Sequence, residues 1–458
     1  MKKAAENDGG FADFYFLYHA KRIQAVHPSL NDQTRRNMMT KQTLRNVLAT
    51  AWLLLIPTMP LSAQTRVATV TVSNTQRMTR TDEPVVIRLQ SVNTRKFVAR
   101  SAVVTCGRDT IPCQLDDTDG DGRADELAFV ADFRPNETRQ FVLNFSAKPS
   151  QRTYPSRVYA DLMLDDKKGA LPRLRSIEAE GNAYIYNDLH HHGAAFESER
   201  VGYRIYFDKR QNIDLYGKRL QRLELADTHF YTTAEQLQQD YGNDVLWAGN
   251  RIGCGTLRPW YSTTWQTGRM GDWNEVEVRG QRIVAAGPVR TIVEMTDRGF
   301  EGMNVTTRYT LYAGHRDMQV DVVLDAPLKK PLFCTGVQKI GEGAALFRPL
   351  EGYAATWGSD YPEQSNEQMR QLFPPEAVGL AVYVPTAYVV SSREDDENCL
   401  LIIGKKGNRA FQYHVAFCAE KEIDGFRSQT EWFAYMKTWT NALANPLRVR
   451  LARQVRTR

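Results

Sequence analysis

Hydrophobic and polar residues alternate with a period of two along much of this chain, which is the spacing of half-buried β-strands. The clearest example is VGYRIYFD, residues 201–208. One face of this predicted strand carries Tyr203, Ile205 and Phe207. The other face carries Arg204, Tyr206 and Asp208, so the strand can build a core on one side and contact a polar ligand on the other.

Short alternating segments separated by turn residues fill residues 64–150. They read TVTVSN, PVVIRLQ, KFVARSAVVT, DTIPCQL, ELAFVADF and RQFVLNFS. This pattern predicts a small immunoglobulin-like β-sandwich.

Longer strands follow in residues 151–458, where helical periodicity is sparse. A long hairpin is predicted in which alternate residues of 305–311 share one face, residues 313–316 turn, and alternate residues of 318–324 share the next face. This second part is therefore predicted to be a large antiparallel β-supersandwich.

Only two helices are expected, over residues 233–240 after Thr232 and over residues 431–445 before Pro446. The prediction is an all-β protein with few helices. About 395 residues follow the leader described below, which exceeds the usual size of one domain, so we place a boundary between the two sandwiches at about residue 150.

The first 63 residues have the pattern of a leader that ends in a secretory signal peptide. A basic stretch precedes an apolar run over residues 47–56, and small residues end at Ala63 before Gln64. We expect cleavage near Ala63/Gln64 and a periplasmic or extracellular protein. The apolar run is shorter than the ~20 residues that a membrane span requires, so no span is expected.

Charge excludes one class of partner. Without residues 1–63, which hold eight Lys/Arg and four Asp/Glu, the net charge falls from +6 to +2. No basic patch with interleaved aromatic residues follows, so nucleic acid is not an expected partner. No organic cofactor is expected, and the sequence does not indicate an oligomeric state.

All six cysteines follow the leader. In an oxidising compartment, Cys106 and Cys113 either close a hairpin as a disulfide or stay as two reduced, partly buried thiols. The spacing of the other four fits no zinc site.

Acidic residues recur in residues 117–126, DTDGDGRADE. The carboxylate oxygens of Asp117, Asp119, Asp121 and Asp125 are of the kind that Ca²⁺ prefers. Ala128 stands where an EF-hand loop has its bidentate Glu. The motif therefore indicates either a structural Ca²⁺ site or an acidic turn of the Asp/Gly type.

Chemically diverse side chains concentrate in residues 188–218. Three consecutive histidines end on Gly193, which favours a turn, and the polar face of residues 201–208 follows. Tyr216 and Lys218 come next. This density resembles the convergent polar groups of a ligand cleft, whereas the simpler interpretation is a solvated strand beside a turn.

Four runs of the sequence resemble the secreted bacterial family catalogued as domain of unknown function 4861, over nearly all of the chain after the leader. They are HHHGAAFESERVGYRIYFDKRQNIDLYGK, DYGNDVLWAGNRIGCGTL, GPVRTIVEM with VTTRYTLYAGHRDMQVDVVLD, and YAATWGSDYP. The family occurs in polysaccharide-degrading gene sets, so the resemblance implies an oligosaccharide or polysaccharide ligand. GPVRTIVEM and the hairpin also look like the large sandwich of galactose-mutarotase-like proteins, which is a likeness of fold alone.

Elimination on a uronate-containing oligosaccharide needs a base for the C–H beside the carboxylate, a cation for that carboxylate, and an acid for the leaving oxygen. The candidates are His191 or His192 as base, Arg204 as cation, Tyr206 or Tyr216 as acid, and Lys218 as a second positive contact. We therefore predict lyase-like or dehydratase-like elimination.

Alternatives stay open. Hydrolysis needs two carboxylic acids, for which Glu197, Glu199 and Asp214 are nearby. Regular alternation places Glu197 and Glu199 on the face of Tyr203, away from Arg204, which argues against one shared pocket. A sugar epimerase is also open, and a non-catalytic glycan-binding protein would use the same sheet without chemistry.

Aromatic residues elsewhere add to the predicted site. Trp357 offers a ring to stack on a sugar, and Asp360 an acid for its hydroxyls, although a buried Trp at the end of a strand explains the first equally well. The loop that holds Trp260, Trp265 and Trp273 is a candidate cleft wall.

Overall fold

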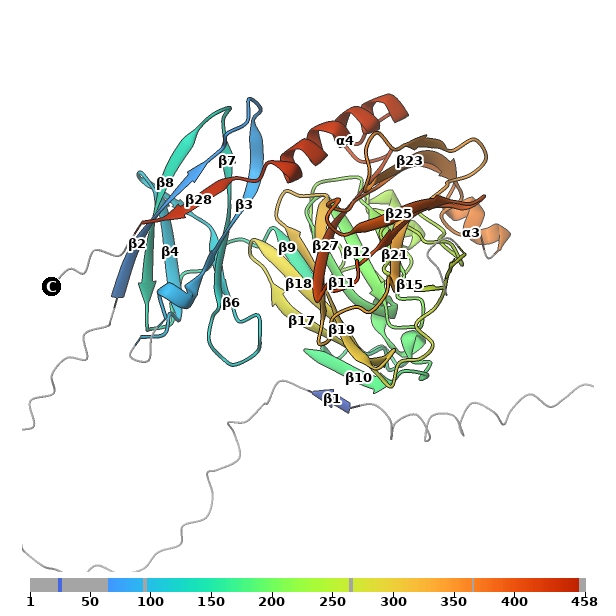
Figure 1. Cartoon of the computed structure of the whole chain (residues 1–458), viewed down its shortest axis with the longest axis horizontal. Coiled ribbons are helices and arrows are strands. Elements are labelled where there is room, and N and C mark those ends of the chain that lie inside the picture. Colours follow the sequence, from blue (N-terminus) through green and yellow to red (C-terminus); the bar gives the residue numbers. More distant parts are fainter. Residues whose placement is uncertain (1–23, 27–64, 94–96, 263–266, 365, 453–458) are drawn as a thin grey trace, which may run out of the picture.

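The computed structural model describes residues 24–26, 65–93, 97–262, 267–364 and 366–452 (Figure 1). Apart from residues 24–26, the predicted leader and its cleavage site lie outside these residues, as does Trp265. The described chain is mainly β, and all of its paired strands are antiparallel, as the alternation predicts.

The small sandwich consists of two sheets whose facing sides form their own core. Its first sheet has the order β28 (Arg448–Leu451), β2 (Thr65–Ser73), β8 (Thr138–Ser146), β4 (Ser101–Cys106) and β5 (Asp109–Ile111). Its second has β3 (Arg80–Arg88), β7 (Glu126–Phe133) and β6 (Cys113–Asp116). Phe129 and Phe141 meet in the core with ring centroids 4.9 Å apart.

The last strand corrects our division of the chain. We assigned all of residues 151–458 to the large sandwich, but β28 pairs with β2 and so completes the small one. Figure 1 shows this red strand among the blue ones. An edge strand such as β2 presents unpaired backbone groups, and β28 satisfies part of that edge.

The large sandwich packs one wide sheet against two narrower ones. The wide sheet has the order β1 (Gln24–Val26), β10 (Ser176–Glu180), β17 (Val278–Ala286), β18 (Arg290–Phe300), β19 (Met303–Tyr312), β20 (Asp317–Leu324), β27 (Ala410–Ala419), β24 (Glu376–Tyr383), β23 (Tyr353–Asp360) and β22 (Ala345–Phe347). One narrow sheet has β14 (Asn243–Asp244), β13 (Ile213–Gly217), β12 (Val201–Tyr206), β11 (Gly193–Ser198) and β9 (Val158–Asp161). The other has β16 (Arg269–Met270), β15 (Arg258–Tyr261), β21 (Phe333–Gln338), β26 (Asn398–Ile403) and β25 (Val389–Glu394).

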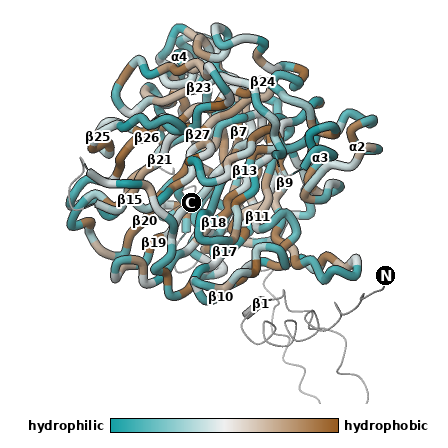
Figure 2. The backbone as a smooth tube through the Cα atoms, turned by 90° about the vertical axis from the view of Figure 1, so that its right-hand side faces the viewer, coloured by the Kyte–Doolittle hydropathy of each residue, from teal (hydrophilic) through white to brown (hydrophobic). Residues whose placement is uncertain are grey.

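The predicted hairpin is confirmed as β19 and β20, which pair from Val305↔Leu324 to Leu311↔Met318. Its core-facing residues are at most a few per cent exposed, for example Tyr309 at 1% and Val320 at 0%. The strands of the large sandwich alternate between hydrophilic and hydrophobic colours in Figure 2. The core therefore lies between the sheets, and the polar faces point outward.

Helices are few among the described residues: α2 (Ala234–Gln238), α3 (Glu367–Leu372) and α4 (Gln429–Ala444), with 3-10 turns η1 (Leu89–Ser91), η2 (Tyr186–Asp188) and η3 (His190–His192). The two predicted helices correspond to α2 and α4. Thr233, not Thr232, caps α2, and Ser428 caps α4. In the part of the chain that the structure covers, none of the helices has the length and apolar character needed to cross a membrane.

The two sandwiches are joined by buried polar contacts. Arg290 of β18 contacts Asp116 at 2.7 Å and Glu126 at 2.8 Å, both from the small sandwich. The backbone N–H groups of Val289 and Arg290 donate to Gln114 at 2.8 and 2.9 Å. These contacts fix the small sandwich against the wide sheet.

All six cysteines are free thiols. Cys106 ends β4 in one sheet of the small sandwich, and Cys113 begins β6 in the other, so the two do not face each other across one hairpin. The predicted disulfide is not formed, and the alternative of two reduced thiols describes the structure.

Candidate functional site

A cavity of about 260 Å³ lies on the outer face of the narrow sheet that holds β12 and β13. We call it the His192 cavity. It is lined by aromatic, acidic and other polar residues, among them Tyr186, His192, Tyr206, Asp208, Arg210, Asp214, Phe230, Tyr231, Asp244, Trp247 and Glu363. Three predicted candidates, His192, Tyr206 and Asp214, thus meet at one place.

The alternation in β12 explains why Tyr206 reaches this cavity. Tyr203 and Ile205 are fully buried in the core between the sheets, so Tyr206 projects from the opposite face. The segment between β13 and β14 and the residues after β23 cover that face and close the cavity.

His192 has one free ring nitrogen. Its Nδ1 lies 3.2 Å from the carbonyl oxygen of Tyr186, and because a carbonyl only accepts, Nδ1 carries the proton. Burial, with the nearby Arg204, lowers the pKa of His192, so the ring is neutral at neutral pH. Within the described residues, Nε2 has no hydrogen-bond partner, which leaves it able to accept a proton.

Aromatic rings form the walls. The ring of Tyr206 lies 5.6 Å from that of His192 and 6.4 Å from that of Tyr186, while Phe230 lies 4.0 Å from His192. Burial, followed by the charge of Asp214, raises the pKa of Tyr206, so its hydroxyl stays protonated. Walls of this kind suit the C–H faces of a sugar.

Arg204 does not line this cavity but lies behind it. Its side chain is fully buried and forms ion pairs with both Asp214, at 2.6 Å, and Asp244. Its Nη1 donates to the carbonyl oxygen of Phe230 at 2.5 Å, and the ring of Phe230 packs 4.3 Å from the guanidinium carbon. The structure therefore places Arg204 as an internal support of the two aspartates, not as an open cation.

The acids of the cavity are all engaged by donors. Asp214 and Asp244 share Arg204, and Asp208 accepts the backbone N–H groups of Arg210 and Gln211, each at 2.8 Å. Glu363 accepts the hydroxyl of Tyr231. Asp208 and Glu363 are thus held as hydrogen-bond acceptors, whereas Asp214 and Asp244 are held by their ion pairs with Arg204.

Arg210 supplies the positive charge at the rim. Its side chain is 36% exposed, its Nη1 donates to the carbonyl oxygen of Gly249 at 2.9 Å, and its Nε lies 3.7 Å from Asp208. No hydrogen bond of its Nη2 is found in the described part of the chain. This guanidinium can reach an anionic group at the mouth of the cavity.

His191 and Tyr216 are buried away from the cavity lining. His191 is 1% exposed, and its Nε2 lies 3.2 Å from the carbonyl oxygen of Leu225. Burial, with Arg204, holds its pKa well below the ordinary value. Tyr216 is fully buried and donates to Glu224 at 2.9 Å.

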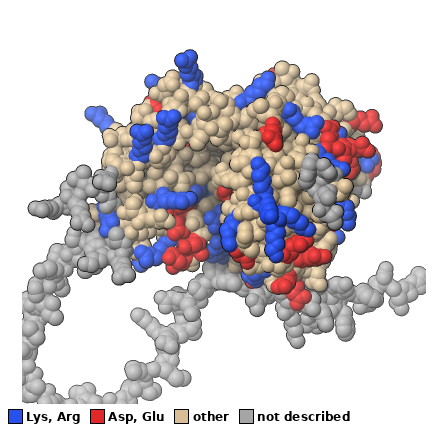
Figure 3. All heavy atoms as spheres, in the orientation of Figure 1, with Lys and Arg blue, Asp and Glu red and all other residues tan. Residues whose placement is uncertain are grey.

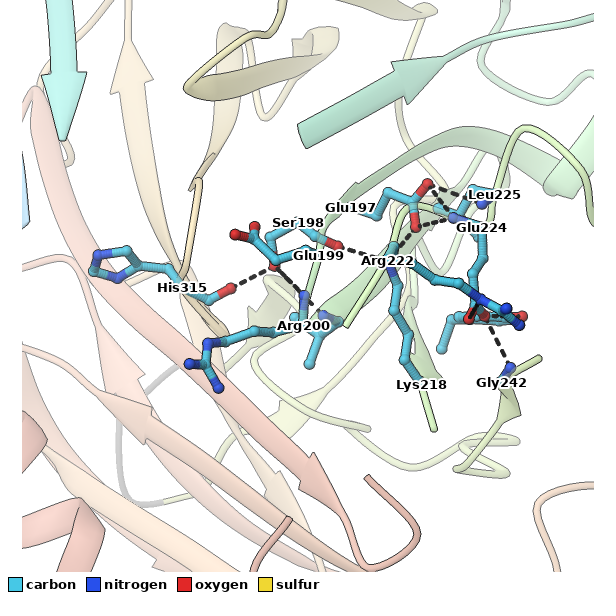
Figure 4. Close-up of polar contacts among 12 residues, drawn as sticks. Glu197, Ser198, Glu199, Arg200, Lys218, Arg222, Glu224, Leu225, Gly242 and His315 are labelled. Atoms are coloured by element: carbon cyan, nitrogen blue, oxygen red, sulfur yellow. Dashed lines mark hydrogen bonds and ion pairs between the residues drawn. The ribbon is translucent and has the colours of Figure 1, made fainter. Parts of the chain in front are cut away.

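Lys218 belongs to a separate buried network, shown in Figure 4. Its Nζ pairs with Glu197 and donates to the carbonyl oxygens of Ser198 and Arg222, both at 2.6 Å. The backbone N–H groups of Glu224 and Leu225 also donate to Glu197 at 2.9 Å. All three ammonium protons of Lys218 are thus used within the protein.

Our placement of Glu197 on the face of Tyr203 is wrong. In the pairing of β11 with β12, Phe196 lies opposite Tyr203 and Ala195 opposite Arg204, so Glu197 shares the side of Arg204. The alternation does not continue through residues 199–200 because the chain turns there between the two strands. Glu199 binds Arg157 at 2.5 Å instead.

Trp357 and Asp360 lie in β23. Trp357 packs against the cluster beneath α4, so the interpretation as a packed Trp describes it. Asp360 accepts from Gln364 at 3.0 Å. Pro362 and Glu363, just beyond the predicted segment, are the residues that reach the His192 cavity. Trp260 and Trp273 are buried.

The acidic loop brings three of its four predicted carboxylates together. Oxygens of Asp117, Asp119 and Asp125 lie within 4.8 Å of one another, and Asp121 is outside this group. Asp117 and Asp125 also accept backbone N–H groups of the loop. The donor set fits Ca²⁺, which stays a prediction.

Most residues of the cavity were not among our candidates, and Arg210, Asp244, Trp247 and Glu363 are examples. Asp244 and Trp247 lie in the run DYGNDVLWAG, which we used as a family signature only. That run was the signal in the sequence that could have identified Asp244 and Trp247 as site residues. Because they lie far from β12 along the chain, local patterns do not show that they lie near it in space.

The fold and cavity define a mainly antiparallel β protein with an aromatic, acid-lined pocket. The chain belongs to the family described as a domain of unknown function, DUF4861, whose model matches residues 72–449. No curated protein matches the chain.

Two solved structures are weakly similar. A protein in the glycosyl hydrolase family 38 from Enterococcus faecalis is 9% identical with a TM-score of 0.46, and the match covers 84% of this chain and 47% of that one. An alpha-mannosidase from Enterococcus faecalis V583 is 7% identical with a TM-score of 0.44, with 85% and 46% covered. The chain thus spans about half the length of these structures.

Proposed function

We propose that the protein acts on carbohydrate in the His192 cavity and that the reaction is elimination on a uronate-containing oligosaccharide. The observation that carries this proposal is the state of His192, a neutral ring with Nδ1 fixed to Tyr186 and Nε2 free beside the ring of Tyr206. A neutral imidazole is a suitable base at neutral pH.

Each step of the reaction has a group in the cavity. Nε2 of His192 takes the proton from the carbon beside the uronate carboxylate, and the released electron pair forms the new C=C bond. The bond from the neighbouring carbon to the leaving oxygen breaks, and the hydroxyl of Tyr206 gives that oxygen its proton. Transfer of a proton from His192 to Tyr206 restores both groups.

The cation in this scheme is Arg210 and not Arg204. Arg204 is fully buried between two aspartates, whereas the guanidinium of Arg210 is partly exposed at the rim. A guanidinium can hold a carboxylate in two hydrogen bonds while negative charge moves onto it.

Hydrolysis of a neutral glycoside is the second candidate, and charge favours it. Four carboxylates line the cavity, against Arg210 at the rim and Arg204 behind it. This negative excess disfavours an anionic substrate and stabilises a positively charged, oxocarbenium-like transition state. The four carboxylates are all engaged by donors, which argues against a free general acid.

The experiment incubates the protein with uronate-containing and neutral oligosaccharides. Elimination gives an ultraviolet-absorbing unsaturated product, hydrolysis gives reducing ends without that absorbance, and binding alone gives neither. His192→Gln must abolish the product, while His229→Gln, which changes an exposed histidine outside the lining, must not. Elimination that survives in His192→Gln rejects the proposal.

We further propose that the protein is secreted and meets its substrate outside the cytoplasm. We propose that Ca²⁺, if bound by Asp117, Asp119 and Asp125, acts only on the stability of the small sandwich. The loop contacts the wide sheet through the carbonyl oxygen of Thr118, which accepts from Arg308 at 3.0 Å, and it does not line the His192 cavity.

A further inference from the structure

A second cavity, of about 670 Å³, lies between the two sandwiches. We call it the inter-sandwich cavity. Its walls come from β3 of the small sandwich, from the outer faces of β20 and β27, and from α4. In Figure 1, α4 runs from the large sandwich toward the small one, so it borders both halves.

This cavity is remote from the His192 cavity. His414 and Gln412 alternate along β27 with the core residues Tyr413 and Val415, so they point away from the core of the large sandwich. The His192 cavity lies outside the narrow sheet across that core. The two cavities are therefore on opposite outer faces.

The walls are held in place by their own contacts. Arg80 of β3 pairs with Glu83 at 2.7 Å and donates to the carbonyl oxygen of Asn445 at the end of α4 at 2.7 Å. His315 contacts Asp317 at 2.9 Å and the carbonyl oxygen of Asp82 in the small sandwich at 3.0 Å. Both partners of His315 are acceptors, so both ring nitrogens donate and the ring is charged.

Three polar side chains on the walls, those of His414, Gln412 and Arg200, do not hold the walls together. Within the described residues, the side chains of His414 and Gln412 make no hydrogen bond. The guanidinium of Arg200 is 29% exposed and only approaches Asp424, at 3.6 Å, while Asp424 already accepts from Gln221. These groups stand beside Tyr435 and Trp439 of α4 and Phe426.

The charge of the lining differs from that of the His192 cavity. Arg80, Arg200 and the charged His315 face Glu83, Asp317 and Asp424, and Arg316 pairs with Glu422 at 2.6 Å, so the charges nearly balance. On the face drawn in Figure 3, both basic and acidic side chains are found on each half. Unlike the His192 cavity, this lining therefore has no excess of carboxylates.

We infer that the inter-sandwich cavity is a binding site for an anionic saccharide, separate from the site of the proposed reaction. Arg200 holds the carboxylate or sulfate, His414 and Gln412 hydrogen-bond to hydroxyls, and Tyr435 with Trp439 packs against the sugar ring. An anchor here would hold a charged glycan on the protein whatever the reaction in the other cavity.

Calorimetric titration tests the inference on the His192→Gln protein, in which turnover is removed. The probes are trigalacturonate, the neutral maltotriose and acetate. We expect trigalacturonate binding that weakens at least about tenfold in Arg200→Gln and several-fold in Gln412→Leu, because one charged and one neutral hydrogen bond are lost. Arg298→Gln, at an exposed pair with Glu178, must leave it unchanged.

Other results overturn the inference. One is that Arg200→Gln binds trigalacturonate as tightly as the protein with His192→Gln alone, or that only Arg210→Gln removes the binding. Another is that maltotriose or acetate binds as tightly as trigalacturonate, or that trigalacturonate does not bind. Failure of the proposed reaction is seen separately, as turnover that does not depend on His192.

Discussion

The rings of His192 and Tyr206 meet edge to face, and their centroids are 5.6 Å apart. They lie at one end of the pair of neighbouring strands β11 and β12. His192 comes from the turn before β11, and Tyr206 ends β12, which pairs with β11 beginning at Gly193↔Tyr206. The register of one hairpin thus brings the proposed base and acid together.

Removing the hydroxyl of Tyr206 should slow the reaction without unfolding the protein. We expect Tyr206→Phe to lower kcat by about 10²–10⁴-fold with little change in KM, since the leaving oxygen then lacks its proton donor. Tyr184→Phe is the control, because Tyr184 is 64% exposed and outside the cavity lining. Steady-state kinetics with purified oligosaccharide measures both, and an unchanged kcat in Tyr206→Phe would exclude this role.

The pH dependence should report His192. Burial lowers its pKa from 6.5, and the base must be neutral, so kcat/KM should stay flat down to that pH and fall only below it. A pH profile of kcat/KM measures the pH at which this fall on the acidic side occurs. An acid limb centred above 6.5 would mean that another group titrates.

Lys218 should matter for stability and not for substrate. Its side chain is 1% exposed and that of Glu197 is 0% exposed, so Lys218→Met leaves a buried carboxylate without its counter-ion. We expect a loss of about 3–5 kcal/mol in the free energy of unfolding, of which Glu197→Gln in the same protein restores part. Urea unfolding measures this.

The exposed pair Arg298–Glu178 supplies the matched control for Lys218. Arg298→Gln should change the free energy of unfolding by less than about 1 kcal/mol. If Lys218→Met costs no more than this control, the network in Figure 4 does not stabilise the fold in the way its burial implies.

The contact of His315 with Asp317 should make stability depend on pH. Burial opposes protonation of His315, but Asp317 outweighs it and raises the pKa from 6.5 to about 9. The stabilisation is complete below 6.5 and is lost as pH rises toward 9. In the same way, His315 outweighs burial and lowers the pKa of Asp317 from 3.8 to about 2, so that contribution is present above 3.8 and lost as pH falls toward 2.

Urea unfolding between about pH 6 and about pH 10 measures this effect. The loss of stability over that range should be smaller in His315→Gln, which has no charge to lose. An equal loss in both proteins would place the titrating group elsewhere.

Much of the fold could be predicted because alternation reports burial directly. Tyr203 and Ile205 are in the core, as the pattern in β12 requires, and the hairpin of β19 and β20 has the predicted faces. The pairing of β28 with β2 could not be predicted, because four residues with an alternating pattern do not specify which distant edge they join.

The site could be predicted only in part for the same physical reason. Alternation places Arg204 on the polar face, but it does not show that Phe230 and two aspartates cover that face and bury the guanidinium. Asp244 and Glu363 reach the cavity from segments far along the chain. Their approach depends on tertiary packing, which local patterns do not contain.

A substrate deuterated at the carbon beside the uronate carboxylate tests abstraction of that proton by His192 most directly. Elimination predicts that deuteration slows formation of the unsaturated product in the wild-type protein, and that His192→Gln forms no such product. Release of reducing ends at the same rate from both substrates, without unsaturation, would contradict it and favour hydrolysis.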